Sequence, residues 1–194
     1  VPPTLDRFDA MISGRGAPDQ SFGHLMPLMG ELTLEAVAYN CILAGCRPEE
    51  LPVVLTAAEA CTDDGFNLLG VLSTTGTPTV AICVHGSLVT DLDMNAGSNA
   101  LGPGNRANAC IGRAVSLIMR NVAGAKPGVA DMATMGQPGK YTFCFAESAH
   151  PGFPSLPERR GFGANESCVT VLGVSGTAEV LPISGGESPE AVLQ

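Results

Sequence analysis

Residues 97–122 read GSNALGPGNRANACIGRAVSLIMRNV, a Gly- and Asn-rich loop that runs directly into a helical pattern. From Asn105 to Val122, small and aliphatic side chains recur at helical spacing, which is typical of an amphipathic helix. Gly124 and Pro127 then end the helix. This is the main helix that the sequence predicts.

Three arginines of this helix, Arg106, Arg113 and Arg120, recur every seven residues and so share one face. A glycine-rich approach exposes backbone N–H groups, and an arginine can hold an anion with two parallel hydrogen bonds. We therefore predict Arg106 and Arg113 as anchors for an anionic ligand, with surface ion pairs as the alternative. Arg120 lies in the last turn, where a cation favours the helix C-terminus without any ligand.

Asparagines crowd the same loop and helix start, at positions 95, 99, 105 and 108. Turn and cap positions favour asparagine, and this structural role accounts for about half of them. Amides that face inward would give a pocket neutral donors and acceptors for a carboxyl or carbonyl group. The sequence thus predicts Asn99, Asn105 and Asn108 as substrate-binding residues.

The overall composition predicts one loop-rich domain, because 194 residues can bury a sizeable core and include 24 glycines and 15 prolines. We expect an N-terminal arm over residues 1–30, a domain over 31–183 and a polar tail over 184–194. No apolar run of about 18 residues and no signal-peptide pattern occurs. These features predict a soluble, cytoplasmic protein without a membrane partner.

The charge distribution is uneven within a formal net charge of −9. Residues 1–99 carry −9, residues 100–140 carry +4 and residues 141–194 carry −4. The acidic total argues against a nucleic-acid partner, because phosphate backbones bind net basic surfaces. A cationic island within an acidic chain instead favours a small anion or an acidic patch on another protein.

Turn residues and hydrophobic patterns place further elements on both sides of the main helix. Thr33 is a suitable N-cap, Gly45 a helix stop, and Pro48 and Pro52 predict a turn followed by a new helix. Gly, Pro and β-branched residues mark the strands and loops. The predicted helices span 5–12, 34–43 and 53–61, the strands 66–73, 79–84, 141–146, 168–173 and 179–183, and the loops 127–140 and 148–165.

These elements predict an α/β fold in which a small mixed sheet is flanked by helices. His85 ends the strand over 79–84, and Glu147 ends the strand over 141–146. Strand ends commonly carry catalytic side chains in α/β folds, so both residues are predicted as acid/base candidates. A structural histidine, and an ion pair of Glu147 with Arg159 or Arg160, are the alternatives.

Two of the seven cysteines are candidate nucleophiles. Cys46 precedes Arg47-Pro48 and therefore sits at an expected helix start beside a cation, an environment that lowers the pKa of a thiol. Cys110 lies one turn after Arg106 on the same face. A buried, unreactive thiol is the alternative for both, since cysteine is among the most buried residue types.

Several cofactor sites are not indicated by the sequence. The Gly-rich loop lacks the Lys-Ser/Thr of a P-loop and the preceding strand of a dinucleotide fingerprint, so no nucleotide cofactor is predicted. The cysteines form no C-x-x-C pair, and the three histidines have no metal-binding spacing. Cys46, Cys110 and Cys144 could still bind a metal if the fold gathers them.

Several segments together resemble the bacterial proteins associated with the UGSC family, which is named for a Sec/Cys-Gly-Ser-Cys motif. The resemblance spans roughly residues 30–173 and implies a domain that often accompanies a separate thiol or selenol domain, hence sulfur-related or redox chemistry. This chain contains no Cys-Gly-Ser-Cys motif. The segments that carry the resemblance are AGCRPE at 44–49, FNL at 66–68, NALGPGNRANA at 99–109, IGRA at 111–114, PGKY at 138–141 and AE at 146–147.

Two functions follow from the sequence. The first is an oligomeric bacterial enzyme of lyase or oxidoreductase type that acts on a small, carboxylate-bearing metabolite through the Gly/Asn-rich loop and the arginine helix. Its pocket is expected where the loop over 95–106 meets the strand ends at His85 and Glu147. The second is a non-catalytic subunit whose cationic island docks on an acidic surface of a separate catalytic chain.

Overall fold

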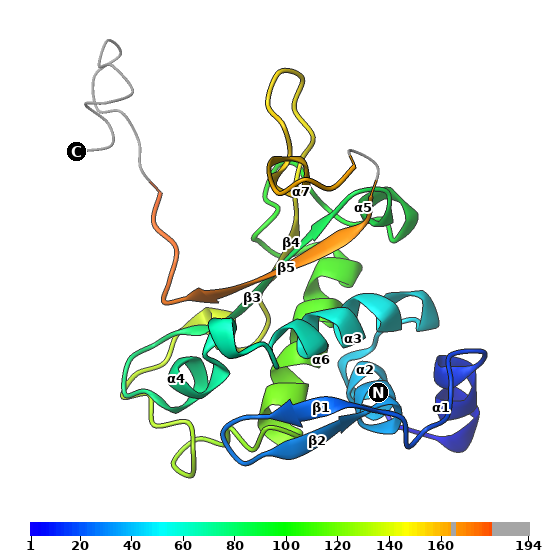
Figure 1. Ribbon diagram of the computed structural model, residues 1–194, viewed down its shortest axis with the longest axis vertical. Coiled ribbons are helices and arrows are strands. Elements are labelled where there is room, and N and C mark those ends of the chain that lie inside the picture. Colours follow the sequence, from blue (N-terminus) through cyan, green and yellow to red (C-terminus); the bar gives the residue numbers. More distant parts are fainter. Residues whose placement is uncertain (164–165, 180–194) are drawn as a thin grey trace.

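The computed structural model describes residues 1–163 and 166–179, which form seven α-helices and five strands in two sheets (Figure 1). The helices are α1 (Leu5–Ile12), α2 (Leu34–Ala44), α3 (Leu51–Ala60), α4 (Leu68–Ser73), α5 (Leu88–Asp91), α6 (Arg106–Asn121) and α7 (Leu156–Arg159). The strands are β1 (Ser21–Leu25), β2 (Gly30–Thr33), β3 (Thr79–His85), β4 (Cys144–Ala146) and β5 (Cys168–Val174), and short 3-10 helices span Pro48–Glu50, Asp64–Phe66 and Pro138–Lys140.

The larger sheet has the strand order β4-β3-β5. β3 pairs in parallel with β4 and antiparallel with β5, so the sheet is mixed, as the sequence predicts. Because the side chains of a strand alternate between faces, the register places Cys83, Phe145 and Thr170 on one face and Ile82 on the other. The sheet therefore has two chemically different faces.

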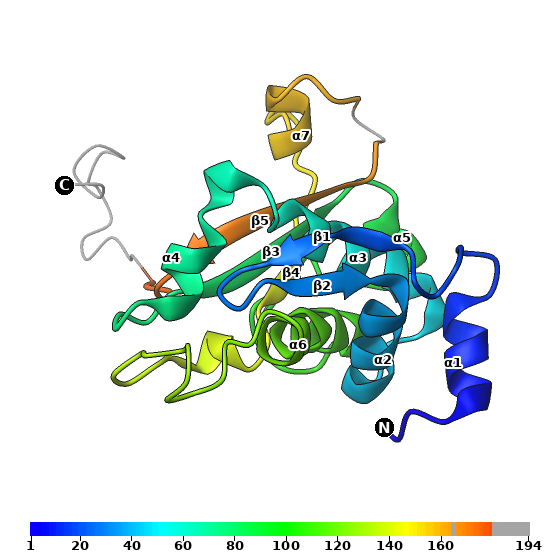
Figure 2. The ribbon, with the colours of Figure 1, turned by 60° about the horizontal axis from the view of Figure 1, so that its bottom comes forward.

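One face of this sheet belongs to the hydrophobic core. Val80, Ile82 and Val84 of β3 are buried there, and α3 and α6 pack against the same side (Figure 2). The opposite face carries His85, Cys83 and Ala81, which are buried but lie outside the core cluster. This second face, on the side away from α6, is where polar side chains gather.

The long helix α6 begins as the sequence predicts. Asn105 is its N-cap, and its side-chain oxygen accepts a hydrogen bond from the backbone N–H of Asn108 at 3.0 Å. A β-carbon on Gly112 would lie 2.7 Å from the backbone nitrogen of Phe143. Glycine thus allows the segment before β4 to approach the helix closely.

The N-terminal segment is part of the same core. β1 pairs with β2, so this hairpin joins residues on both sides of the predicted boundary at residue 30. α1 packs on the outer side of α2 (Figures 1 and 2). Phe8 and Met11 of α1 are buried in the core cluster, and the ring of Phe8 stacks on Tyr39 at 4.8 Å between centroids. Residues 1–30 are therefore packed against the domain that the sequence interpretation began at residue 31.

The structure corrects three element predictions. Residues 66–73 form the end of a 3-10 helix and α4 rather than a strand, because Asn67 caps the helix and accepts a hydrogen bond from Gly70. The predicted strand over 141–146 shortens to Cys144–Ala146, and the predicted loop over 148–165 contains α7. The predicted strand over 179–183 lies, from residue 180 onward, outside the described residues.

The other predicted helices and strands agree with the structure to within two residues, whereas the short helix α5 and the 3-10 helix at the end of the predicted loop over 127–140 were not predicted. Helices are found at the predicted positions for α1, α2, α3 and α6, and strands for β3 and β5. Pro48 begins the predicted turn, and Pro52 lies in the first turn of α3. The hairpin of β1 and β2 was not predicted, because its sequence alternates only weakly between apolar and polar residues.

Candidate active site

The polar face of the sheet joins three side chains from three neighbouring strands. His85 ends β3, Glu147 directly follows β4, and Thr170 lies within β5. The Nδ1 atom of His85 lies 2.6 Å from Oε2 of Glu147, and its Nε2 atom lies 2.9 Å from Oγ1 of Thr170. The sequence prediction that His85 and Glu147 lie together at the strand ends is confirmed.

Hydrogen-bond chemistry assigns a direction to this Glu147–His85–Thr170 relay. An ionised carboxylate only accepts, so in the neutral imidazole Nδ1 carries the proton and Nε2 is left to accept from the Thr170 hydroxyl. His85 is 2% exposed, and bulk water is thereby excluded from its ring. The relay thus consists of an orienting carboxylate, a base and a hydroxyl in the order that nucleophilic catalysis uses.

Glu147 is positioned from its other side by the start of α7. The backbone N–H of Leu156 donates to both carboxylate oxygens, at 3.0 and 3.2 Å. Within the described residues Glu147 has no arginine partner, so the ion pair with Arg159 or Arg160 that the sequence left open is not formed. The carboxylate is therefore held between a backbone donor and the histidine.

A cavity of about 260 Å³ adjoins the hydroxyl end of the relay. Thr170 and Cys168 line it from β5, and Arg160 and Phe162 line it from the segment after α7. β5 is an edge strand of the three-stranded sheet. The lining of this cavity therefore combines the Thr170 side chain with a cation, Arg160.

Close packing of the chain after His85 helps to bring these elements together. Gly86 has a φ of +80°, and a β-carbon there would collide with the backbone of Glu166 and Ser167. The hydroxyls of Ser87 and Ser167 lie 3.2 Å apart in the same place. Glycine at this position thus lets the start of β5 approach the end of β3.

Arg106, which was predicted to bind a ligand, forms an ion pair within the protein. Its guanidinium makes two hydrogen bonds to the carboxylate of Glu50, which is 1% exposed and also accepts from the backbone N–H of Arg47 at 3.0 Å. Glu50 was not recognised as a partner, because it lies 56 residues away in sequence. Arg106 thus forms an ion pair, as in the alternative that the sequence left open, but its partner is a buried carboxylate rather than one on the surface.

The environment of Cys46 is the reverse of the predicted one. A hydrogen bond with the Cys41 thiol, burial, and the negative charge of Glu50 raise the pKa of the Cys46 thiol. The expected lowering by Arg47 is wrong, because no cation is among the groups that shift the pKa of Cys46, whereas the carboxylate of Glu50 raises it. The pKa of Cys110 is also raised, mainly by burial and by Cys46, although Arg106 opposes the shift.

All seven cysteines are free thiols in this structure. In the parts of the chain that the structure describes, no group of three or more His, Cys, Asp or Glu side chains is arranged to hold a metal ion. Burial, and then the charges of Cys83, Cys46 and Glu50, raise the pKa of Cys144. The raised pKa values of Cys46, Cys110 and Cys144 keep these three thiols protonated, so a thiolate nucleophile is not favoured there at neutral pH.

The asparagines of the Gly/Asn-rich loop mostly bond to the loop itself. Asn108 accepts from the backbone N–H of Asn95 at 3.1 Å and donates to its carbonyl at 2.9 Å. Asn105 donates to the carbonyl of Asp93 at 2.6 Å, and Asn99 donates to that of Pro103 at 3.1 Å. These contacts organise the approach to α6, and neither of the two cavities described here is lined by residues 95–106.

Arg113 lines a different and larger cavity, of about 620 Å³. This cavity lies between α6, the segment over 125–141 and the first residues of β3, Thr79 and Val80. Thr79 and His85 are six residues apart on one strand, which corresponds to about 20 Å. The structure therefore separates Arg113 from the histidine relay, although the sequence interpretation placed both in one pocket.

Several residues of these sites were not predicted. Thr170 and Arg160 adjoin the relay, and Arg120 and Gln137 line the larger cavity. The strand predicted over 168–173 includes Thr170, but only the pairing of β5 with β3 brings this residue to His85. No local sequence pattern indicates which distant strands pair with each other.

No helix within residues 1–163 and 166–179 is both long enough and apolar enough to span a bilayer.

Comparisons of the chain with protein-family models, with curated proteins and with solved structures gave no match. The UGSC resemblance stays a prediction, and a function has to be argued from the site itself.

Proposed function

We propose that the protein is an enzyme that acts on a small carboxylate-bearing metabolite, with Thr170 as nucleophile and His85 as base. The observation that carries the proposal is the hydrogen-bonded relay from Glu147 through His85 to the Thr170 hydroxyl. The distances of 2.6 and 2.9 Å match those between base, orienting group and hydroxyl in nucleophilic catalysis.

The reaction that this arrangement supports is acyl transfer from an ester or thioester. Thr170 Oγ1 attacks the acyl carbon while its proton passes to Nε2 of His85. Collapse of the intermediate expels the alcohol or thiol, which takes that proton from His85, and leaves an acyl-threonine. Water then repeats the same proton transfers, releasing the acid and restoring the hydroxyl.

The cavity beside Thr170 supports the choice of an anionic substrate. Arg160 lines it and, within the described residues, has no side-chain ion pair or hydrogen-bond partner. A guanidinium binds a carboxylate through two parallel N–H donors. A volume of about 260 Å³ suits a short acyl group.

Reaction with p-nitrophenyl acetate tests the proposal. The wild-type protein should release p-nitrophenol in a burst, and a peptide that contains Thr170 should gain one acetyl group by mass spectrometry. Thr170→Val should abolish the acylation, Thr170→Ser should retain it, and His85→Gln should lower the rate by about 10²–10⁴-fold. Ser87→Ala is the matched control, because its hydroxyl is nearby but contacts no histidine.

A purely structural relay gives a different pattern. In that case the wild-type protein would not be acylated at Thr170, while Thr170→Val would still lower the unfolding midpoint by removing a hydrogen bond between strands. That combination would overturn the proposal.

A non-catalytic subunit is the second candidate, and one observation favours it. Large apolar side chains are exposed along the segment from residue 129 to 141, namely Val129, Met132, Met135 and Tyr141. Exposed apolar side chains on one segment favour an interaction surface. Light scattering of the purified protein separates the two, since a monomer without esterase activity favours the subunit.

A further inference from the structure

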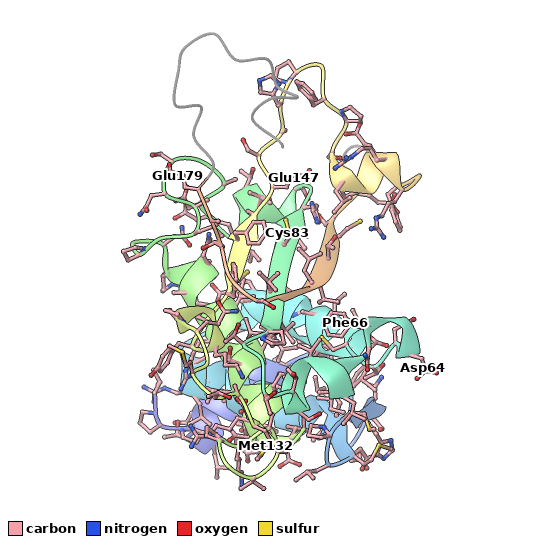
Figure 3. All side chains as sticks on the ribbon, turned by 90° about the vertical axis from the view of Figure 1, so that its left-hand side faces the viewer. Asp64, Phe66, Cys83, Met132, Glu147 and Glu179 are labelled. Atoms are coloured by element: carbon pink, nitrogen blue, oxygen red, sulfur yellow. The ribbon has the colours of Figure 1, made fainter. Side chains whose placement is uncertain are left out.

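We propose that the larger cavity binds a small molecule with a carboxylate at each end, that is, a short dicarboxylate. The cavity, of about 620 Å³, lies within the usual size range for metabolite sites. It is at the far end of β3 from the relay, and Figure 3 shows Met132, in the bordering segment, far from Glu147. The inference therefore does not rest on the proposed reaction at Thr170.

The charges that line this cavity leave two arginines for a ligand. Lys140 and Asp131 neutralise each other, with Nζ 2.7 and 2.8 Å from the two carboxylate oxygens. Arg113 donates one long hydrogen bond, of 3.4 Å, to the carbonyl of Tyr141. Arg120 has no hydrogen-bond or ion-pair partner among the described residues. The cavity thus carries an excess of two positive charges.

The spacing of the arginines selects a ligand with two separated anionic groups. Arg113 and Arg120 lie seven residues apart on α6, which places their α-carbons about 10.5 Å apart on one face. Ser116 lies between them and also lines the cavity. Each guanidinium can hold one carboxylate with two parallel hydrogen bonds, whereas a compact dianion such as phosphate satisfies only one of them well.

The walls between the arginines suit the chain that joins the two carboxylates. Met119 and Ala125 are buried there, and Val80 of β3 is added from the sheet. Methylene groups gain from such apolar contact, and Gln137 adds a polar side chain to the lining. The combination of two cationic ends and an apolar middle matches a dicarboxylate.

Isothermal titration calorimetry with succinate, glutarate and adipate tests this inference, with butyrate and inorganic phosphate as single-ended controls. At least one dicarboxylate should bind, and its affinity should exceed that of butyrate and phosphate by about 10-fold or more. Binding should weaken as salt concentration rises, because both contacts are ionic.

Variants locate the site. Arg113→Gln and Arg120→Gln should each weaken dicarboxylate binding by about 10-fold or more, since each removes one charge-assisted pair. Arg159→Gln is the matched control, because Arg159 is exposed and lines neither cavity. Thr170→Val should leave the affinity unchanged, which separates this site from the proposed catalytic one.

Three results would overturn the inference. They are the absence of binding by all three dicarboxylates at millimolar concentration, equal or tighter binding of butyrate or phosphate, and dicarboxylate binding that both arginine variants leave unchanged.

Discussion

Glu50 and His85 are polar side chains at 1% and 2% exposure, and each is buried together with its partners. Glu50 meets the guanidinium of Arg106 and the backbone N–H of Arg47, and His85 meets a carboxylate and a hydroxyl. Within the described residues, no buried side-chain nitrogen or oxygen lacks a hydrogen-bond partner. Burial of a polar group without partners is unfavourable by several kcal/mol, so these networks allow the two side chains to be buried.

The buried thiol of Cys61 yields a prediction about pH. Burial raises its pKa to about 12, whereas an unfolded thiol ionises near 8.5. Between these values the unfolded chain has lost the proton that the folded chain keeps. This thiol alone should therefore make the free energy of unfolding fall as pH rises, by up to about 1.4 kcal/mol per pH unit.

Urea unfolding between about pH 8 and pH 10.5 measures this slope. Cys61→Ala should flatten it relative to the wild type. Cys168→Ala is the control and should change it less, because the thiol of Cys168 is partly exposed. Equal slopes in the Cys61→Ala variant and the wild type would contradict the interpretation.

At the scale of elements, α6 packs against α2, α3, β3 and β4. Its N-terminus pairs with Glu50 at the end of the first 3-10 helix, its middle packs on the segment before β4, and its later turns line the larger cavity. The close approach in the middle depends on Gly112. A β-carbon there would lie 2.5 Å from Oγ1 of Thr142 and 2.7 Å from the nitrogen of Phe143.

Gly112→Ala should destabilise the protein by about 1–3 kcal/mol through this overlap, although alanine favours a helix by about 1 kcal/mol. Thermal unfolding compares it with Gly97→Ala, where the nearest atom, Oδ1 of Asn95, leaves ordinary space at 3.7 Å. A Gly112→Ala variant as stable as the wild type would show that β4 does not need this contact.

At the scale of the whole molecule, one core runs from α1 to the sheet. Phe8 and Met11 belong to the same buried cluster as Ile82 and Ile111. The N-terminal residues thus stabilise the domain rather than extend from it as an arm. A small domain with one core is expected to unfold in a single cooperative transition.

Phe8→Ala should lower the free energy of unfolding by about 3 kcal/mol, because it leaves a cavity between α1 and α2. Leu5→Ala, on the exposed side of the same helix, should change it by less than about 0.5 kcal/mol. Denaturant unfolding compares the two variants. If residues 1–30 were a separate arm, both substitutions would have the same small effect.

Local chemistry accounts for the parts of the fold that the sequence predicts well. Thr33, Gly45, Pro52 and Asn105 act on backbone groups within a few residues, and the helices begin or end beside them. The strand predicted over 66–73 was wrong. Apolar residues in a short run suit a strand and a short buried helix alike, and the cap at Asn67 favours the helix.

The candidate site was predictable only in part. His85 and Glu147 could be chosen because each follows an apolar strand, and parallel neighbours bring such ends together. Thr170 could not, since its partnership with His85 depends on the antiparallel register of two strands 85 residues apart. The ion pair of Arg106 could not be predicted either, because its partner, Glu50, lies 56 residues away in the sequence.

The sequence alone determined where the four longest helices and the strands β3 and β5 begin and end, which residues are cationic, and that a mixed α/β fold results, because these properties follow from neighbouring residues. Tertiary structure alone decided which arginine is paired and which lines a cavity, and which hydroxyl meets the histidine. Those outcomes depend on contacts between distant segments, and such contacts form only when the core packs.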